Sequence, residues 1–296
     1  MKVLNLSGGA TKASGEVGIC EVLIKNGYTP DIITGVSAGA VLAVPMALGL
    51  WDEMIQFSTN LRLKQIFSKP PITEKGKLSK TSYWRFIRRK ESLGVMGTLE
   101  KTISKVVTPG HFKEYKKDKY PIVYIMAVNS ATGKRHFYNV KELSYKEYLT
   151  LTVASSSIPL ANEKVKYKGL YLTDGGIRNG IISHWLLEKY QAQIKESISV
   201  YARPQNLKEL LDSNWKPQQV EDTAIRDLQI MMLQISIADE KRELAIAELH
   251  GIKNTQLFLP KVLEHSFDTN PTALRNLYLE GKNVAFKHLL NDKNSI

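Results

Sequence analysis

The chain has 296 residues, 43% of them hydrophobic, which is ample for one sizeable core and borderline for two domains. Its single cysteine, Cys20, excludes an internal disulfide, and no stretch approaches the roughly 20 apolar residues that would cross a bilayer. The formal net charge is +12, and residues 61–120 alone carry 16 basic residues against 5 acidic ones. The opening residues, MKVLNLSGG, lack an apolar run of signal-peptide length, so we expect a cytoplasmic protein.

Strand-like and helix-like segments alternate along the chain. Strands are predicted at residues 2–8, 31–37, 120–133, 134–140, 167–176 (with its turn), 197–204 and 255–260. Helices are predicted at residues 15–27, 38–50, 141–157, 182–193, 218–249 and 271–290, the second of them kinked or ended near Pro45. This alternation predicts an α/β fold with a largely parallel sheet. Residues 51–120 interrupt it, and we expect a basic helical insertion or cap there.

The stretch TGVSAGA places Ser37 between two glycines, Gly35 and Gly39, after a predicted strand and before a predicted helix. Strand, tight turn and helix are the context in which Gly-x-Ser-x-Gly forms a nucleophile elbow. The turn lifts the serine oxygen above the sheet edge, and the helix N-terminus favours a developing negative charge. The pattern therefore predicts a catalytic serine, although a chance match in a glycine-rich loop is the alternative.

A second loop, LSGGATKASG, joins the first predicted strand to the first predicted helix. The ends of neighbouring parallel strands lie together, so Gly8, Gly9 and Ala10 are expected beside Ser37. Their N–H groups suit the oxyanion of an acyl-transfer intermediate. A nucleotide-phosphate loop is the weaker interpretation, because the Gly-Lys-Ser/Thr ending and the Gly-x-Gly-x-x-Gly spacing are both missing.

The nucleophile needs a base, and none of the six histidines lies in an obvious strand-end loop. Asp174 follows an apolar strand and precedes Gly175 and Gly176 in LTDGGIRNG. An Asp-Gly-Gly sequence is often a plain turn. Here it is the third small-residue loop at a strand end, and open α/β folds place their sites where such loops converge.

Four ordered motifs, SGGATKASG, GVSAG, VASSSIPL and TDGG, resemble those of the patatin-like phospholipases. The resemblance implies a three-layer α/β/α domain spanning residues 1–296, which includes the cap and is closed by the helix YLEGKNVAFKHLL. It implies Ser37 as nucleophile, Asp174 as base and no metal or other cofactor. It also implies an oxyanion loop of Gly8, Gly9 and Ala10. The supporting residues would be Lys12, Gly35, Gly39, Gly175 and Gly176.

The chain departs from the family pattern at both loops. In the first loop the family usually has three glycines, any residue, arginine and glycine, where this chain has Ala10, Lys12 and Ala13. Lysine keeps the charge but lacks the planar fork of arginine, and alanine is less free in φ than glycine. After Asp-Gly-Gly the family often has asparagine and proline, where this chain has Gly180 and Ile182. These changes bear on substrate preference and rate more than on the Ser–Asp pair.

The basic segment mixes aromatic and cationic side chains around residues 83–90. These are Tyr83, Trp84 and Phe86 with Arg85, Arg88, Arg89 and Lys90. Rings at headgroup depth and cations on lipid phosphates would explain this mixture, so peripheral docking on an anionic membrane is predicted. A solvated face is the alternative, and nucleic acid is not expected because no recognised nucleic-acid module surrounds the segment.

The predicted function is a lipid acyl hydrolase of the phospholipase A type, acting on phospholipids or other acyl-ester lipids. Two rival enzymes remain: an acyltransferase with the same dyad, and an α/β-hydrolase with a Ser–His–Asp triad. The triad enzyme predicts an essential late histidine and usually several strands before the nucleophile, where this chain has one. A non-catalytic lipid-binding protein is disfavoured by the presence of Ser37 and Asp174.

Overall fold

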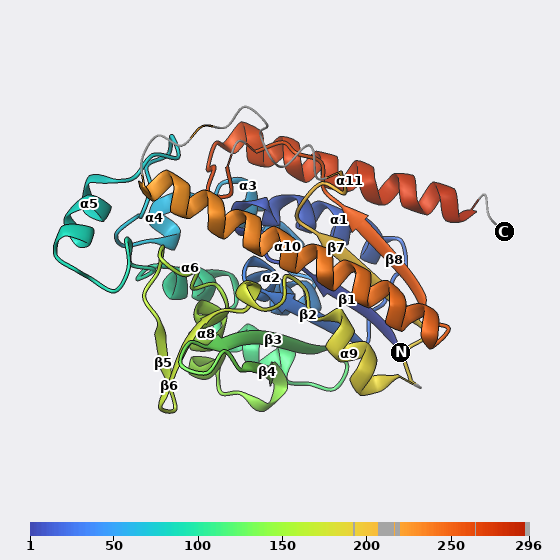
Figure 1. Ribbon diagram of the computed structural model, residues 1–296. Coiled ribbons are helices and arrows are strands. Elements are labelled where there is room, and N and C mark those ends of the chain that lie inside the picture. Colours follow the sequence, from blue (N-terminus) through green and yellow to red (C-terminus); the bar gives the residue numbers. More distant parts are fainter. Residues whose placement is uncertain (192, 207–215, 217–219, 264, 294–296) are drawn as a thin grey trace.

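The computed structural model describes residues 1–191, 193–206, 216, 220–263 and 265–293 (Figure 1). Its sheet contains β1 (Lys2–Leu6), β2 (Ile32–Val36), β3 (Ile122–Asn129), β4 (Arg135–Asn139), β5 (Val165–Tyr167), β6 (Leu170–Asp174), β7 (Glu196–Tyr201) and β8 (Lys253–Phe258). The order β8-β7-β1-β2-β3 is parallel throughout, and β4, β5 and β6 add antiparallel pairs. The predicted α/β fold with a mostly parallel sheet is confirmed.

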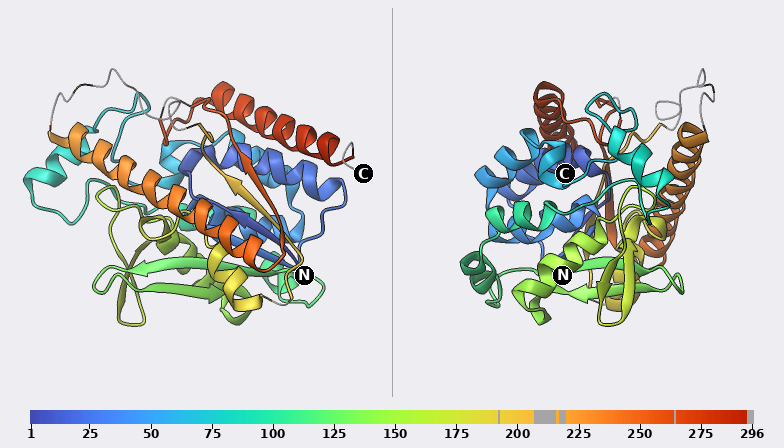
Figure 2. Two further views of the ribbon diagram at one scale, coloured as in Figure 1. Left: turned by 45° about the vertical axis from the view of Figure 1, so that its right-hand side comes forward. Right: turned by 90° about the vertical axis from the view of Figure 1, so that its left-hand side faces the viewer.

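Helices cover both faces of the sheet (Figure 2). One face carries α1 (Ala13–Lys25), α2 (Ala38–Leu48), α3 (Trp51–Thr59), α8 (Tyr145–Ser155) and α11 (Pro271–Lys293). The other face carries α9 (Ser183–Tyr190) and α10 (Val220–Leu249). Two apolar clusters, one on each side, bury the central strands, which explains why those strands are nearly continuous apolar runs.

Strand β6 lies end to end with β2 along one edge of β3. Residues 124–126 of β3 pair with β2 on one side and β4 on the other, while residues 127–128 pair with β4 and β6. Because β4 occupies one edge throughout, β2 and β6 share the opposite edge. Sequence reasoning expected three loops at the carboxyl edge of parallel strands. The third loop instead follows an antiparallel strand that begins beyond that edge and runs back toward it.

The predicted insertion at residues 51–120 divides into two parts. Helices α3, α6 (Leu99–Val106) and α7 (Pro109–Tyr115) pack on the main core, where Ile103, Phe112 and Tyr115 are buried. Residues 60–98 hold α4 (Leu63–Ile66) and α5 (Lys80–Ile87), and α5 protrudes at one end of the molecule (Figures 1 and 2). The protruding part is therefore shorter than the predicted insertion.

Several predicted elements differ in detail from the observed ones. Helix α2 includes Pro45 and ends at Leu48, because Gly49 takes a left-handed conformation with φ of 72°. A 3-10 turn, η2 (Val140–Glu142), precedes α8, which begins after the capping residue Ser144. Parts of two predicted helices, residues 192 and 218–219, lie outside the described residues. No described helix is long and apolar enough to cross a membrane.

Candidate active site

Ser37 occupies a strained turn between β2 and α2. Its φ of 54° and ψ of −120° are unusual for a residue with a side chain, and such outliers gather at functional sites. The turn needs the flanking glycines, because a Cβ on Gly35 would lie 2.4 Å from the carbonyl oxygen of Gly39. A Cβ on Gly39 would lie 2.7 Å from the carbonyl oxygen of Leu6. The local sequence thus has the shape of a nucleophile elbow.

Ser37 and Asp174 meet directly. The Ser37 hydroxyl donates to Oδ2 of Asp174 at 2.7 Å, and the N–H of Gly176 donates to Oδ1 at 2.6 Å. Asp174 is fully buried, and this burial raises its pKa to about 7, although both hydrogen bonds act in the opposite direction. A carboxyl group with this pKa is suited to exchange protons near neutral pH.

The predicted oxyanion loop lies against Ser37. A Cβ on Gly8 would lie 3.0 Å from the Cβ of Ser37, so only glycine fits there without a shift. The N–H of Gly8, however, already donates to the carbonyl oxygen of Gly180 at 3.1 Å. Among the described residues, no acceptor takes the N–H of Gly9 or of Ala10. The expected set of three donors is therefore reduced to two in this structure.

Ala10 stands where the family pattern has a glycine, and it adopts φ of 52°. This left-handed conformation costs an L-residue roughly 1–2 kcal/mol, so the surrounding contacts must impose it. On the far side of Ala10, the N–H and the hydroxyl of Thr11 both donate to the carbonyl oxygen of Ser266, at 3.1 and 3.0 Å. The loop is thus held at Gly8 and at Thr11, and the N–H groups of Gly9 and Ala10 lie between these anchors.

Sequence reasoning missed Ser7 and Glu16, which anchor the base of this loop. Oε1 of Glu16 accepts the N–H and the hydroxyl of Ser7, at 3.1 and 3.0 Å. Burial raises the pKa of Glu16 to about 8, so this side chain is largely protonated at neutral pH. A glutamate one turn into a helix carries no sequence signal for such a role.

Two serines of the motif VASSSIPL support the elbow, a role that sequence reasoning did not assign. The Ser155 hydroxyl donates to the carbonyl oxygen of Met126 at 2.6 Å and accepts the N–H of Ser37 at 3.0 Å. The Ser156 hydroxyl donates to the carbonyl oxygen of Ser37 at 3.1 Å. Both backbone groups of Ser37 are therefore fixed by the last residue of α8 and the residue that follows it. The run of three serines was the available sequence signal.

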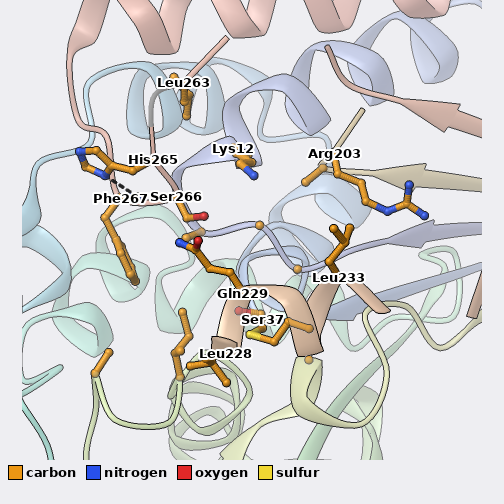
Figure 3. A pocket seen from close by; sticks show the side chains of 18 of the residues that line it. Lys12, Ser37, Arg203, Leu228, Gln229, Leu233, Leu263, His265, Ser266 and Phe267 are labelled. Atoms are coloured by element: carbon orange, nitrogen blue, oxygen red, sulfur yellow. Dashed lines mark hydrogen bonds between the residues drawn. The ribbon is translucent and has the colours of Figure 1, made fainter. Parts of the chain in front are cut away.

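Ser37 and Asp174 line a cavity of about 380 Å³. Figure 3 shows this cavity from close by. Its walls are mostly apolar and come from the cap, the 158–161 loop, α10 and the 259–267 segment; they include Ile72, Leu78, Leu93, Ile158, Leu228, Met232, Leu233, Leu263 and Phe267. Lys12 also lines it, and burial together with the nearby Lys261 lowers the pKa of Lys12. A mostly apolar cavity that also holds a few polar groups is typical of small-molecule sites.

The cap residues predicted to dock on membranes fall into two groups. Tyr83, Trp84, Phe86 and Ile87 are 53–71% exposed, and Arg88 lies over the Trp84 ring at 5.8 Å. Arg85 does not share this surface. The Arg85 side chain is 11% exposed and pairs with Glu163 at 2.6 Å. Arg85 was one of the cations predicted to dock on the membrane, but Glu163 already neutralises its charge within the protein.

Comparison with known proteins supports the resemblance seen in the motifs. Residues 4–182 match the family model described as patatin-like phospholipase. The chain belongs to this family. A comparison with curated protein sequences gives no match.

A comparison with solved structures gives further matches. VipD from Legionella pneumophila is similar at 12% identity and a TM-score of 0.51, over 97% of this chain and 66% of that chain. ExoU, a type III effector, is similar at 11% identity and a TM-score of 0.47, over 98% of this chain and 53% of that chain. ExoU in complex with SpcU, from Pseudomonas aeruginosa, is similar at 12% identity and a TM-score of 0.40, over 84% of this chain and 52% of that chain. The chain thus spans about two thirds of VipD and half of ExoU, and the predicted patatin-like α/β/α fold is confirmed.

Proposed function

We propose that this chain hydrolyses ester-linked acyl chains of phospholipids through an acyl-enzyme on Ser37, with Asp174 as the base. Membership of the patatin-like phospholipase family supports lipid hydrolysis in general. The observation that carries the specific mechanism is the 2.7 Å hydrogen bond from the Ser37 hydroxyl to a buried carboxyl group with a pKa near 7. Among the described residues, no histidine hydrogen-bonds to Ser37, which favours the dyad over a triad.

The proposed reaction has two proton-balanced halves. Ser37 Oγ attacks the ester carbonyl carbon while its proton passes to Asp174, and the carbonyl oxygen becomes an oxyanion facing the N–H groups of Gly9 and Ala10. Collapse breaks the bond to the leaving alcohol, which takes the proton from Asp174. Water then attacks the acyl carbon and gives a proton to Asp174, which returns it to Ser37 as the fatty acid leaves.

The cavity walls support an acyl chain as the group held over Ser37. Apolar side chains dominate those walls. Transfer of an acyl chain from water into such a cavity favours binding by roughly 0.8 kcal/mol per buried CH₂ group. An acyltransferase uses the same first half-reaction and differs only in the acceptor. We expect water to be the acceptor, and therefore free fatty acid as the product.

The test is product analysis with phospholipid vesicles. Wild-type protein should release fatty acid and lysophospholipid, while Ser37→Ala and Asp174→Asn should release neither. A parallel reaction with an added long-chain alcohol separates the two enzyme classes, because an acyltransferase would convert most of the acyl group to the new ester. Activity that survives in Ser37→Ala would refute the proposed mechanism.

We also propose that α5 docks the enzyme on anionic lipid. Three aromatic rings and Ile87 project into solvent from a helix of eight residues, next to Arg88, Arg89 and Lys90. The helix adjoins the cavity, because the hydroxyls of Ser79 and Ser82 bond the carbonyl oxygens of Pro70 and Pro71, and Pro71 lines the cavity wall. Docking through α5 would therefore bring the Pro71 wall of the cavity close to the lipid surface.

The matched variants for this test are Arg88→Gln/Arg89→Gln and Lys101→Gln/Lys105→Gln. Each removes two exposed cations from the same basic segment, but the second pair lies on α6. The first double variant should bind anionic vesicles about 10- to 30-fold more weakly, at roughly 1 kcal/mol per basic residue, with little loss for the second. Equal losses in both variants, or binding that ignores salt and anionic lipid, would refute docking through α5.

A further inference from the structure

A chain of hydrogen bonds connects α10 to the predicted oxyanion loop. The N–H of Gly8 donates to the carbonyl oxygen of Gly180 at 3.1 Å. The N–H of Gly180 in turn donates to Oδ2 of Asp239 at 2.8 Å, and Oδ1 of Asp239 accepts Nδ2 of Asn179 at 2.7 Å. One carboxylate on α10 therefore fixes two consecutive residues, and the second of them fixes the first glycine of the loop.

The surroundings leave this chain little freedom to move. Asp239 is 1% exposed, and a Cβ on Gly180 would lie 3.2 Å from the Cβ of Ser236, one turn earlier on α10. Gly8 itself packs against Ser37, since a Cβ added to Gly8 would lie only 3.0 Å from the Cβ of Ser37. A shift of Gly180 would therefore be passed to Gly8, and from there to the N–H groups of Gly9 and Ala10.

Asp239 is surrounded by a small set of charged and titratable side chains. Arg242 on α10 and His184 on α9 each lie 3.8 Å from Oδ1, and Arg135 on β4 donates to Asn179 Oδ1 at 3.0 Å. Burial raises the pKa of Asp239 to about 6 and lowers that of His184 to about 4. At pH 8 the histidine is neutral and the carboxyl is ionised, so both oxygens of Asp239 accept hydrogen bonds.

We infer that Asp239 is a positioning residue of this active site: it holds the Asn179–Gly180 turn so that Gly180 keeps the oxyanion loop in register with Ser37. The inference rests on the proposed function, since it assigns the purpose of this anchor to the developing oxyanion. Donors aimed at an oxyanion are sensitive to small displacements, and misplacement by about 1 Å can cost on the order of 100-fold in rate.

The substitution Asp239→Asn tests the inference at pH 8, because an amide has one acceptor oxygen for two donors. We expect kcat on a soluble ester to fall by roughly 10- to 100-fold with KM changed by less than about threefold. A fluorophosphonate labels a catalytic serine, and its phosphoryl oxygen should accept from the same N–H groups as the oxyanion. The rate at which it labels Ser37 should therefore fall in parallel with kcat.

The exchange variant Asn179→Asp/Asp239→Asn provides the rescue. Its new amide at position 239 donates to the new carboxylate at 179 and accepts the N–H of Gly180, so both hydrogen bonds and the net charge are restored. The new carboxylate also keeps an acceptor for Arg135. We expect kcat and labelling to recover to within about threefold of wild type. A residue that mattered only for general packing would not be rescued in this way.

Glu243→Gln is the matched control. Glu243 is a second buried carboxyl on α10, but it accepts from Tyr201, Asn254 and Gln256 and does not bond the Asn179–Gly180 turn. Its substitution should leave kcat within about threefold. Equal losses in Glu243→Gln and Asp239→Asn, or wild-type kcat in Asp239→Asn, would overturn the inference.

Two further outcomes are covered by the same experiment. If Asp239→Asn does not fold by circular dichroism, Asn179→Ala replaces it, since this removes one bond to Asp239 and keeps the charge. A several-fold fall in kcat is then expected, and an unchanged kcat overturns the inference. A wild-type protein that neither hydrolyses esters nor reacts with the fluorophosphonate refutes the proposed function instead.

Discussion

Ser37 and Asp174 meet because β2 and β6 pair end to end with the same edge of β3. Val36, the residue before Ser37, pairs with Met126, and Asp174 pairs with Ala127. The two side chains come from strands that approach each other end to end, 137 residues apart in sequence, and meet at 2.7 Å. β3 thus sets the spacing of the proposed dyad.

The first prediction concerns the two members of the dyad. Ser37→Ala and Asp174→Asn should each lower kcat by about 10³-fold or more, and the double variant should be no worse, since the residues act as a unit. Single substitution of each histidine should retain most activity, including His265 in the cavity wall. A histidine as essential as Ser37 would replace the dyad with a triad.

The second prediction concerns pH. Asp174 must be ionised to accept the Ser37 proton, and its pKa is about 7. The kcat/KM for a soluble ester should therefore fall tenfold per pH unit on the acid side of a midpoint near pH 7. This midpoint gives the pKa of Asp174 in the free enzyme, because kcat/KM reflects the free enzyme's ionisations. A profile that stays flat down to pH 5 would contradict the role of Asp174 as base.

The third prediction concerns stability. Burial raises the folded-state pKa of Asp174 above its ordinary value of 3.8, so ionisation costs stability between about pH 4 and pH 7, and the full cost is present above pH 7. Asp174→Asn should therefore be more stable than wild type at pH 8, by up to about 4 kcal/mol for a rise of about three pKa units at roughly 1.4 kcal/mol each. Below pH 4 the difference should vanish.

Denaturant unfolding at pH 4, 6 and 8 measures this dependence. Ser37→Ala is the control, because it also removes activity but keeps the buried carboxyl and loses a hydrogen bond to it. It should gain no stability at pH 8. If both variants are stabilised equally, the gain comes from changing the Ser37–Asp174 contact and not from the charge of Asp174.

The fourth prediction concerns the elbow glycines. Gly39→Ala places a Cβ within 2.8 Å of backbone oxygens of Leu6 and Ser7, so the substitution should destabilise the fold by roughly 2 kcal/mol or more and abolish activity. Gly110→Ala in α7 meets nothing closer than 3.7 Å and should be neutral or stabilising by up to about 1 kcal/mol. Thermal unfolding and esterase assays compare the two variants.

The sequence was sufficient to predict the fold class and to single out Ser37, Asp174 and the Gly8–Ala10 loop, because each lies in a small-residue loop after an apolar run. Such loops are specified by the local sequence, through their turn residues and through the hydrophobic periodicity of the segments beside them. The antiparallel direction of β6 was not predictable in this way, since a five-residue strand has the same pattern in either direction.

Long-range hydrogen bonding is the other part that sequence reasoning missed. The Gly8–Gly180–Asp239 chain joins three segments that share no motif, so no local pattern marks Gly8 as an already engaged donor. Arg85 was likewise indistinguishable from Arg88 and Arg89 in sequence. Its separation from them comes from Glu163, 78 residues away, which neutralises it within the protein.

The end-to-end meeting of β2 and β6 has a consequence for biosynthesis. β6 pairs with only three residues of β3, and a slip by one residue would place Thr173 or Gly175 where the carboxylate belongs. On a ribosome, the serine elbow emerges long before the β5–β6 hairpin that delivers its base. If Ser37 acts with Asp174 as we propose, the nascent chain holds an incomplete dyad, and it should gain esterase activity only once this hairpin has docked.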